Sequence, residues 1–127
     1  MISGSRGKGK LHFGLRYALN GLRMAVLTER NIKIHLIAAI LVVIAGVVLS
    51  ITIIEWAIIC LAMSAVISME MMNTALERAL DHLEPEQREL IGIAKDMSAA
   101  AVLVTAVFAV VIACLIFLPK GISIFFS

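Results

Sequence analysis

Long runs of apolar residues, separated by short polar segments, dominate the chain. Residues 36–54 and 97–119 carry no charged side chain, and each meets the length of about 20 residues that a membrane-spanning helix needs. Between them, residues 56–69 are apolar but are followed at once by acidic and amide side chains. If only the outer two runs crossed a membrane, this apolar middle segment would be left on one side of it. The pattern therefore favours three spans.

The predicted architecture is an all-α integral membrane protein. We place the spans at about residues 34–54, 56–81 and 96–118, and an N-terminal amphipathic surface helix at about 11–30, within one membrane-embedded domain of residues 1–127. In the surface helix, polar side chains recur at helical spacing and share one face. These residues are His12, Arg16, Asn20, Arg23 and Arg30, opposite Leu15, Ala18, Leu22, Ala25 and Val26. Such a helix lies along a membrane surface.

Composition and charge support this placement and orient the chain. Hydrophobic residues make up 61% of the chain and charged residues 16%, against roughly 45–50% and 25% in soluble domains. The Lys and Arg residues precede the first span or flank the second loop, except Lys120. Because basic residues collect on the cytoplasmic side, we expect the N-terminus and the loop of residues 81–96 to be cytoplasmic.

Net charge and cysteine content exclude other classes. A net charge of +2 is too small to indicate a nucleic-acid partner. Cys60 and Cys114 stand singly in apolar runs, without the spacing of a disulfide framework or a zinc site. No phosphate-binding GxxxxGK[ST] motif and no protein-kinase signature is present in the sequence.

One face of the predicted middle span carries a polar stripe within an arc of about 80°. Its members are Glu70, Asn73, Glu77 and Asp81. Carboxylates at membrane depth are costly unless they are paired or face a wet cavity. The stripe is therefore either an interhelical hydrogen-bonded cluster, with Lys95 as a candidate partner, or a site for a cation or a proton acceptor. Glu70 and Glu77 lie about 10 Å apart along a helix, which suits a deeper base and a shallower metal ligand.

Two further polar groups are expected at a similar depth. Lys95 and Asp96 begin the third span. Alone, such a pair anchors a helix at the interface, but beside an acidic stripe the lysine also supplies a charge for phosphate. Glu29, at the junction of the surface helix and the first span, adds a third carboxylate.

Two motifs give the chain a family resemblance. ExxNTALExxLD at residues 70–81 and AKDMSAAAVL at 94–103 closely resemble the prokaryotic diacylglycerol kinase family, which includes the undecaprenol kinases of Gram-positive bacteria. GLR at 21–23 and TERNIKIH at 28–35 extend the resemblance over nearly the whole chain. The latter stretch, with the segments IIEW and IFLPK, is more similar to the undecaprenol branch.

The resemblance implies roles for particular residues. Members of the family are homotrimers in a bacterial cell membrane, with active sites between protomers at the cytoplasmic interface. By motif position, Glu70 is the expected general base for a lipid hydroxyl, and Glu29 and Glu77 are the expected Mg²⁺ ligands. The expected nucleotide-binding residues are Lys10, Tyr17, Glu29, Glu77, Lys95 and Asp96. Supporting or substrate-contacting roles are expected for Asn73, Asp81, Arg23 and Asn31.

The predicted function is Mg²⁺- and ATP-dependent phosphorylation of a membrane lipid alcohol, foremost undecaprenol. Diacylglycerol is the alternative acceptor, because the motifs alone do not fix it. An alternative of another class is a small proton or cation transporter subunit that uses the Glu70 and Glu77 face. A conduction path needs polar residues through both leaflets, and the outer halves of the predicted spans carry almost none.

Overall fold

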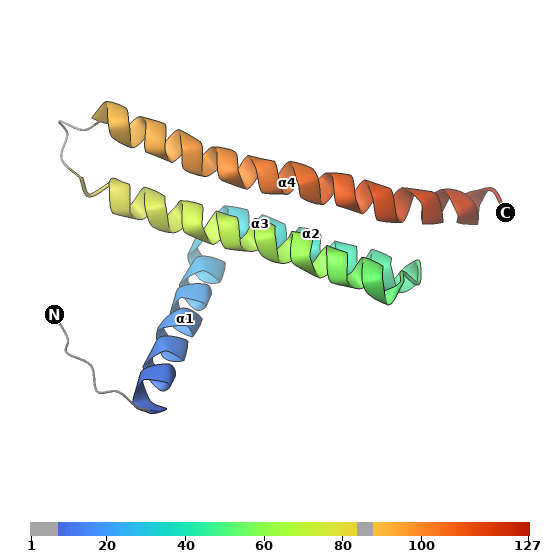
Figure 1. The fold of residues 1–127 in the computed structure, drawn as a ribbon, viewed down its shortest axis with the longest axis horizontal. Helices are drawn as coiled ribbons and strands as arrows, with labels where there is room; N and C mark the ends of the chain where they lie inside the picture. The colour runs from blue at the N-terminus through green and yellow to red at the C-terminus, as the bar shows by residue number, and fades with distance from the viewer. Residues whose placement is uncertain (1–7, 84–87) are drawn as a thin grey trace.

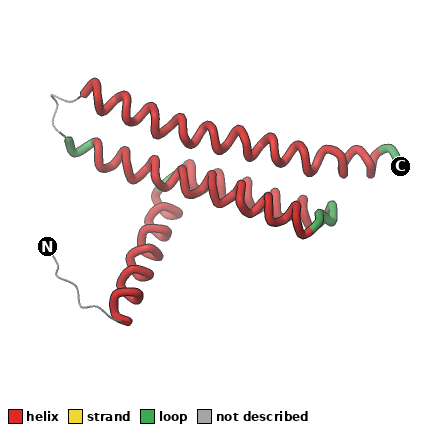
Figure 2. The backbone as a smooth tube through the Cα atoms, in the orientation of Figure 1, coloured by secondary structure: helices red, strands yellow, loops and turns green. Residues whose placement is uncertain are grey.

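The described part of the chain is almost entirely helical. A computed structural model describes residues 8–83 and 88–127, with side chains from residue 14 onward. The helices are α1 (Lys8–Thr28), α2 (Arg30–Val48), α3 (Ile53–Leu80) and α4 (Arg88–Phe125). The part that the structure describes contains no strand (Figure 2). The expected all-α fold is therefore confirmed.

The three long helices lie side by side, and α1 projects steeply from them (Figure 1). α3 makes its most extensive contacts with α4 and also packs against α2. Each of α2, α3 and α4 is long and apolar enough to cross a membrane, including the middle one, which its polar C-terminal half made doubtful. Large apolar side chains on all of these helices are exposed in the single chain. Lipid or other protein chains must cover them, as expected for a membrane protein.

A single residue separates α1 from α2. Glu29 has extended backbone angles (φ −100°, ψ 117°) and occupies the N-cap position of α2. The surface helix therefore ends at Thr28 instead of residue 30, and the first long helix begins at Arg30 instead of residue 34. The residue pattern located this junction but gave its ends only to within a few residues, because one extended residue changes the direction of the chain without disturbing the apolar pattern on either side.

The turn from α2 to α3 is held by a capping box. The Glu55 amide donates to Thr52 Oγ1 (3.2 Å), and the Thr52 amide donates to Glu55 Oε2 (2.8 Å). Because these bonds satisfy amide groups at the helix start, α3 begins at Ile53, ahead of the predicted residue 56. Ser50 completes the turn with a positive φ of 52°.

The buried apolar cluster lies at this turn. Ile51, Ile59 and Ile116 form it, and Trp56 packs against them. Gly46 allows the ring to approach, because a Cβ there would lie 2.6 Å from the Trp56 ring. α4 is longer at both ends than predicted. It begins at Arg88, before the predicted start at residue 96, and it continues through Pro119 beyond the predicted end at residue 118. This cluster therefore packs the helices together at the turn between α2 and α3, whereas Ile32, near the start of α2, is buried at the other end.

Candidate functional site

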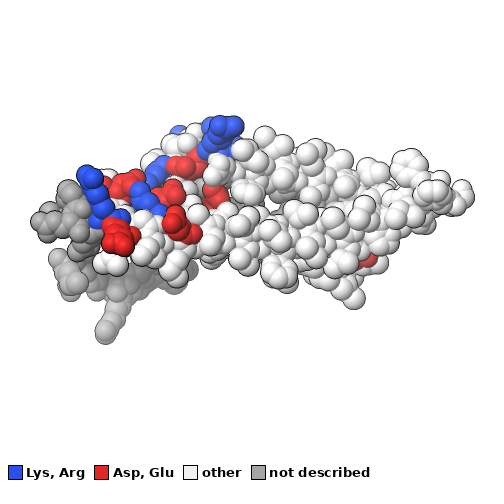
Figure 3. All heavy atoms as spheres, turned by 90° about the horizontal axis from the view of Figure 1, so that it is seen from above, with Lys and Arg blue, Asp and Glu red and all other residues white. Residues whose placement is uncertain are grey.

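Charged side chains gather at the end opposite this core. Figure 3 shows blue and red atoms crowded over one end of the molecule, while the rest of the visible face is almost entirely uncharged. The end combines the α1–α2 junction, the C-terminal half of α3 and the start of α4. At the far end, Lys120 Nζ lies 3.3 Å from Glu55 Oε2. The candidate site is therefore at the α1–α2 junction end.

Glu70 is the deepest carboxylate of the site. Its side chain is 4% exposed, and its Oε2 lies 3.9 Å from His35 Nε2 on α2. Among the residues that the structure describes, no other side chain forms an ion pair with it. A buried carboxylate is costly unless it has a partner, and His35 is the one that the ion pairs of the described residues give it.

Asn73 lies one turn beyond Glu70 and is also buried. The residue is 8% exposed, and its Oδ1 has no hydrogen-bond partner. An unpaired buried amide oxygen costs about 1–3 kcal/mol, so it usually has a reason. Asn73 borders a hollow of about 420 Å³ between α3 and α4, which is otherwise lined mainly by apolar side chains. A hydrogen-bond acceptor is thus present at the edge of an apolar hollow.

Glu29 is tied to α3 by Arg78. The Arg78 guanidinium pairs with the Glu29 carboxylate and donates to Thr28 Oγ1 at 3.0 Å. In the sequence pattern, Arg78 is one of the basic residues that indicate the cytoplasmic side of the membrane. Its position directly after Glu77 in the motif was the available sign that it belongs to the site.

The shallow end of the stripe contacts α4. Lys95 pairs with Asp81, and Glu77 is close enough to Lys95 to interact with it electrostatically. Glu77 is half-buried, whereas Asp81 and Asp96 are exposed. Lys95 therefore contacts the acidic stripe, but its partner is Asp81 and not the deeper Glu70.

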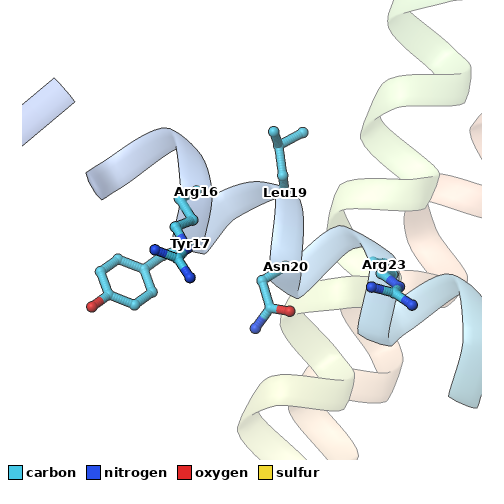
Figure 4. Close-up of a pocket in the computed structure, with 5 residues that line it drawn as sticks. All are labelled: Arg16, Tyr17, Leu19, Asn20 and Arg23. Atoms are coloured by element: carbon cyan, nitrogen blue, oxygen red, sulfur yellow. The ribbon is translucent and has the colours of Figure 1, made fainter. Parts of the chain in front are cut away.

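The remaining predicted residues lie on α1 and at the start of α2. Tyr17 and Arg23 border a hollow of about 550 Å³ together with Arg16, Leu19 and Asn20. Figure 4 shows Leu19 pointing away from the side to which the other four side chains turn. Asn31 is exposed on α2. The Lys10 side chain lies outside the part that the structure describes.

The predicted carboxylates do not converge within one chain. In the described ranges, no three His, Cys, Asp or Glu side chains lie close enough together to hold a metal ion. Glu29 and Glu77 nevertheless supply carboxylate oxygens, the ligands that Mg²⁺ prefers, at the same end of the molecule, because Glu29 pairs with Arg78, the residue after Glu77. The donor chemistry therefore fits magnesium.

Comparison with known proteins gives consistent matches. Residues 16–117 match the family model described as prokaryotic diacylglycerol kinase. The chain is 41% identical to the undecaprenol kinase of Bacillus subtilis over 104 residues, which cover 82% of this chain and 85% of that protein. It is 36% identical to the diacylglycerol kinase of Synechocystis over 110 residues, 86% of this chain and 63% of that protein. Identity to the diacylglycerol kinase of Escherichia coli K12 is 29% over 116 residues, 91% of this chain and 95% of that protein. These matches give no support to the transporter alternative.

Proposed function

The chain belongs to the prokaryotic diacylglycerol kinase family and is a membrane lipid kinase, and from that premise we propose that its acceptor is undecaprenol. The observation that carries the choice of acceptor is the identity of 41% to a protein named undecaprenol kinase, against 36% and 29% to two diacylglycerol kinases. The product is undecaprenyl phosphate.

Glu70 acts as the general base. Its burial at the end of the apolar stretch of α3 supports this role, because the hydroxyl of a lipid in the membrane would approach at such a depth. Glu70 takes the hydroxyl proton while the lipid oxygen attacks the γ-phosphorus of ATP. Phosphoryl transfer needs mainly positioning and charge neutralisation, with a base for the attacking oxygen. The free Asn73 Oδ1, one turn away, is available to orient the incoming alcohol.

Glu29 and Glu77 would hold magnesium with the phosphates, and Lys95, Asp96, Tyr17 and Lys10 would bind the nucleotide. Bound magnesium would supply neutralisation of the phosphate charge. Arg23 and Asn31 support the site from the surface helix and the start of α2. Asp81 supports it by holding Lys95, with which it is paired.

The orientation and assembly follow from the same features. The concentration of charge at one end supports a cytoplasmic location for the α1–α2 junction and for the start of α4, in a bacterial cell membrane. We propose a homotrimer with active sites between protomers. The exposed apolar faces of α2, α3 and α4 offer the surface for that assembly.

A competition assay tests the proposed acceptor. The purified protein in detergent micelles receives labelled ATP, magnesium and equal amounts of undecaprenol and diacylglycerol. We expect magnesium-dependent label mainly in undecaprenyl phosphate. Preferential label in phosphatidic acid would replace the proposed acceptor with diacylglycerol, and the absence of transfer to either lipid would contradict a kinase activity on both.

A matched variant tests the proposed base. Glu70→Gln keeps the size of the side chain but removes its basicity, so transfer should fall by at least about 100-fold. Glu89→Gln, at the exposed start of α4, is the control and should leave transfer unchanged. Retained turnover in Glu70→Gln would contradict the base assignment.

A further inference from the structure

The burial of Glu70 restricts how this residue can release the proton that it takes from the lipid hydroxyl. A base that removes a proton in every turnover must lose it before the next one. Only 4% of the Glu70 side chain is exposed, so direct release to water is hindered. The proton therefore needs a neighbouring group that can accept it.

His35 is the neighbour that the structure provides. Its Nε2 lies 3.9 Å from Glu70 Oε2, and no other described side chain forms an ion pair with this carboxylate. The imidazole is 27% exposed, which makes it much more accessible than the carboxylate. Imidazole is also the side chain whose ordinary proton affinity best suits exchange near neutral pH.

The surroundings of His35 differ on its two sides. Toward the middle of α2, His35 borders a hollow of about 200 Å³ lined otherwise by apolar side chains, among them Ala38 and Ala39. Toward the charged end, Asn31 lies one turn earlier on the same helical face and is exposed. The apolar side of His35 offers no group that could accept a proton. Release of a proton from His35 is therefore expected on the polar side, toward the α1–α2 junction.

We propose that His35 is a positioning residue that receives the proton from Glu70 and releases it toward the α1–α2 junction. This inference rests on the proposed function of Glu70. The lipid O–H bond breaks and its proton goes to Glu70, while the lipid oxygen bonds to the γ-phosphorus and ADP departs with the electron pair of the broken phosphoanhydride bond. The proton then passes to Nε2 of neutral His35, whose Nδ1 carries the other hydrogen, once a side-chain rotation or one bridging water closes the 3.9 Å gap, and it leaves from the imidazolium to water.

The same contact also orients Glu70. The imidazole lies 3.9 Å from Glu70 Oε2 and so limits the positions that the buried carboxylate can take. Loss of the imidazole should therefore slow the turnover of bound substrates without weakening nucleotide binding, because the nucleotide-binding residues proposed above do not include His35.

The test compares His35→Ala and His35→Gln with the control His82→Ala, in the full-length protein with labelled ATP and saturating lipid alcohol. His82 is exposed in the turn after α3. We expect kcat to fall by about 100-fold in both His35 variants, with the KM for ATP unchanged. His82→Ala should match the wild type. Added imidazole should restore part of the kcat of His35→Ala, because the small molecule fits the space that the side chain vacates.

Several outcomes would overturn the inference. A wild-type kcat in His35→Ala would remove His35 from the reaction. Full activity in His35→Gln would show that the contact with Glu70 is only structural. The same conclusion would follow if His35→Ala lost activity, imidazole did not restore it and the purified assembly kept its size. The wild type serves as the reference: if it phosphorylates no lipid alcohol, the proposed function itself fails, whereas an active wild type with equally active His35 variants contradicts only the role of His35.

Discussion

At the scale of single residues, Glu29 is both the extended residue between α1 and α2 and a member of the candidate site. Its extended conformation ends α1 and caps α2, yet its side chain makes no capping hydrogen bond. The carboxylate instead pairs with Arg78 of α3. The residue proposed as a magnesium ligand is thus held in place by a partner 49 positions away in the chain. Its orientation depends on the packing of two helices.

Replacement of Arg78 by Ala should affect activity more than stability. The pair is partly exposed, 51% for the Arg78 side chain and 26% for Glu29, and such pairs contribute about 0.2–1 kcal/mol. Without Arg78, however, Glu29 loses its fixed orientation, so the magnesium concentration for half-maximal activity should rise roughly 10-fold. A magnesium titration of the kinase activity measures this shift.

Two companion variants make the Arg78 result specific. Arg78→Lys keeps the charge and should show a smaller shift. Lys33→Ala removes a positive charge from an exposed position on α2 and should leave the magnesium dependence unchanged. An unchanged magnesium titration in Arg78→Ala would contradict the proposed role of the pair.

Residue patterns predicted part of the site. Helical spacing placed Glu70, Asn73 and Glu77 on one face, and in α3 the first two are buried and the third half-buried. Lys95 was a candidate partner of this stripe, but the sequence did not show that it pairs with Asp81 and not with a deeper carboxylate. The pair of Arg78 and Glu29 was not predicted, because periodicity relates only positions within one helix.

At the scale of elements, hydropathy located the helices, while local hydrogen bonds and backbone angles determined where they end. The capping box of Thr52 and Glu55 starts α3 at Ile53, ahead of the position that the charge of Glu55 suggested. A charged residue in the first turn reads as the edge of a span in a hydropathy pattern. In the structure it is part of the helix, because its carboxylate satisfies an amide group there.

Gly46→Ala should destabilise the turn between α2 and α3. The added Cβ would lie 2.6 Å from the Trp56 ring and 3.1 Å from Ile51 Cδ1, so the buried cluster must shift. Overpacking of this kind costs about 1–3 kcal/mol. The denaturation midpoint in mixed detergent micelles should fall accordingly. Gly121→Ala is the control: a Cβ there meets nothing within 4 Å, and this variant should be at least as stable as the wild type. Equal midpoints for Gly46→Ala and the wild type would contradict the packing argument.

At the scale of the whole molecule, the buried apolar cluster and the charged site lie at opposite ends of the long helices. The cluster packs at the turn between α2 and α3, and the ion pairs of the site lie at the other end. The collection of charge at one end of the helices could be predicted from the sequence, because the positions of charged and apolar residues along the chain do not depend on contacts. The proposed association of protomers could not be derived in this way, because apolar helix faces suit lipid and protein neighbours equally.

Mixing two inactive variants tests whether sites are shared between protomers. Glu70→Gln and Lys95→Ala each remove one proposed site residue. If a site takes these residues from different protomers, random co-assembly of equal amounts should leave about a quarter of the sites intact and restore activity. The kinase assay on the co-refolded mixture measures it, with separate tags to verify co-assembly. Mixed trimers without activity would place both residues of each site in one chain.

The unequal lengths of the helices make the position of the site in the membrane depend on the thickness of the bilayer. With 19 residues, α2 is about 28 Å long, close to the roughly 30 Å of a bilayer's hydrocarbon core, whereas the 38 residues of α4 extend about 57 Å. α2 is bounded by sharp turns at both ends, so it has no spare apolar length with which to follow a thicker bilayer. A thicker bilayer must then either thin beside α2 or bury the flanking residues of α2 more deeply. Thinning costs energy in the lipid, whereas deeper burial changes the depth of His35 and Glu70 below the headgroups. Membrane thickness thereby becomes a variable of the phosphorylation reaction.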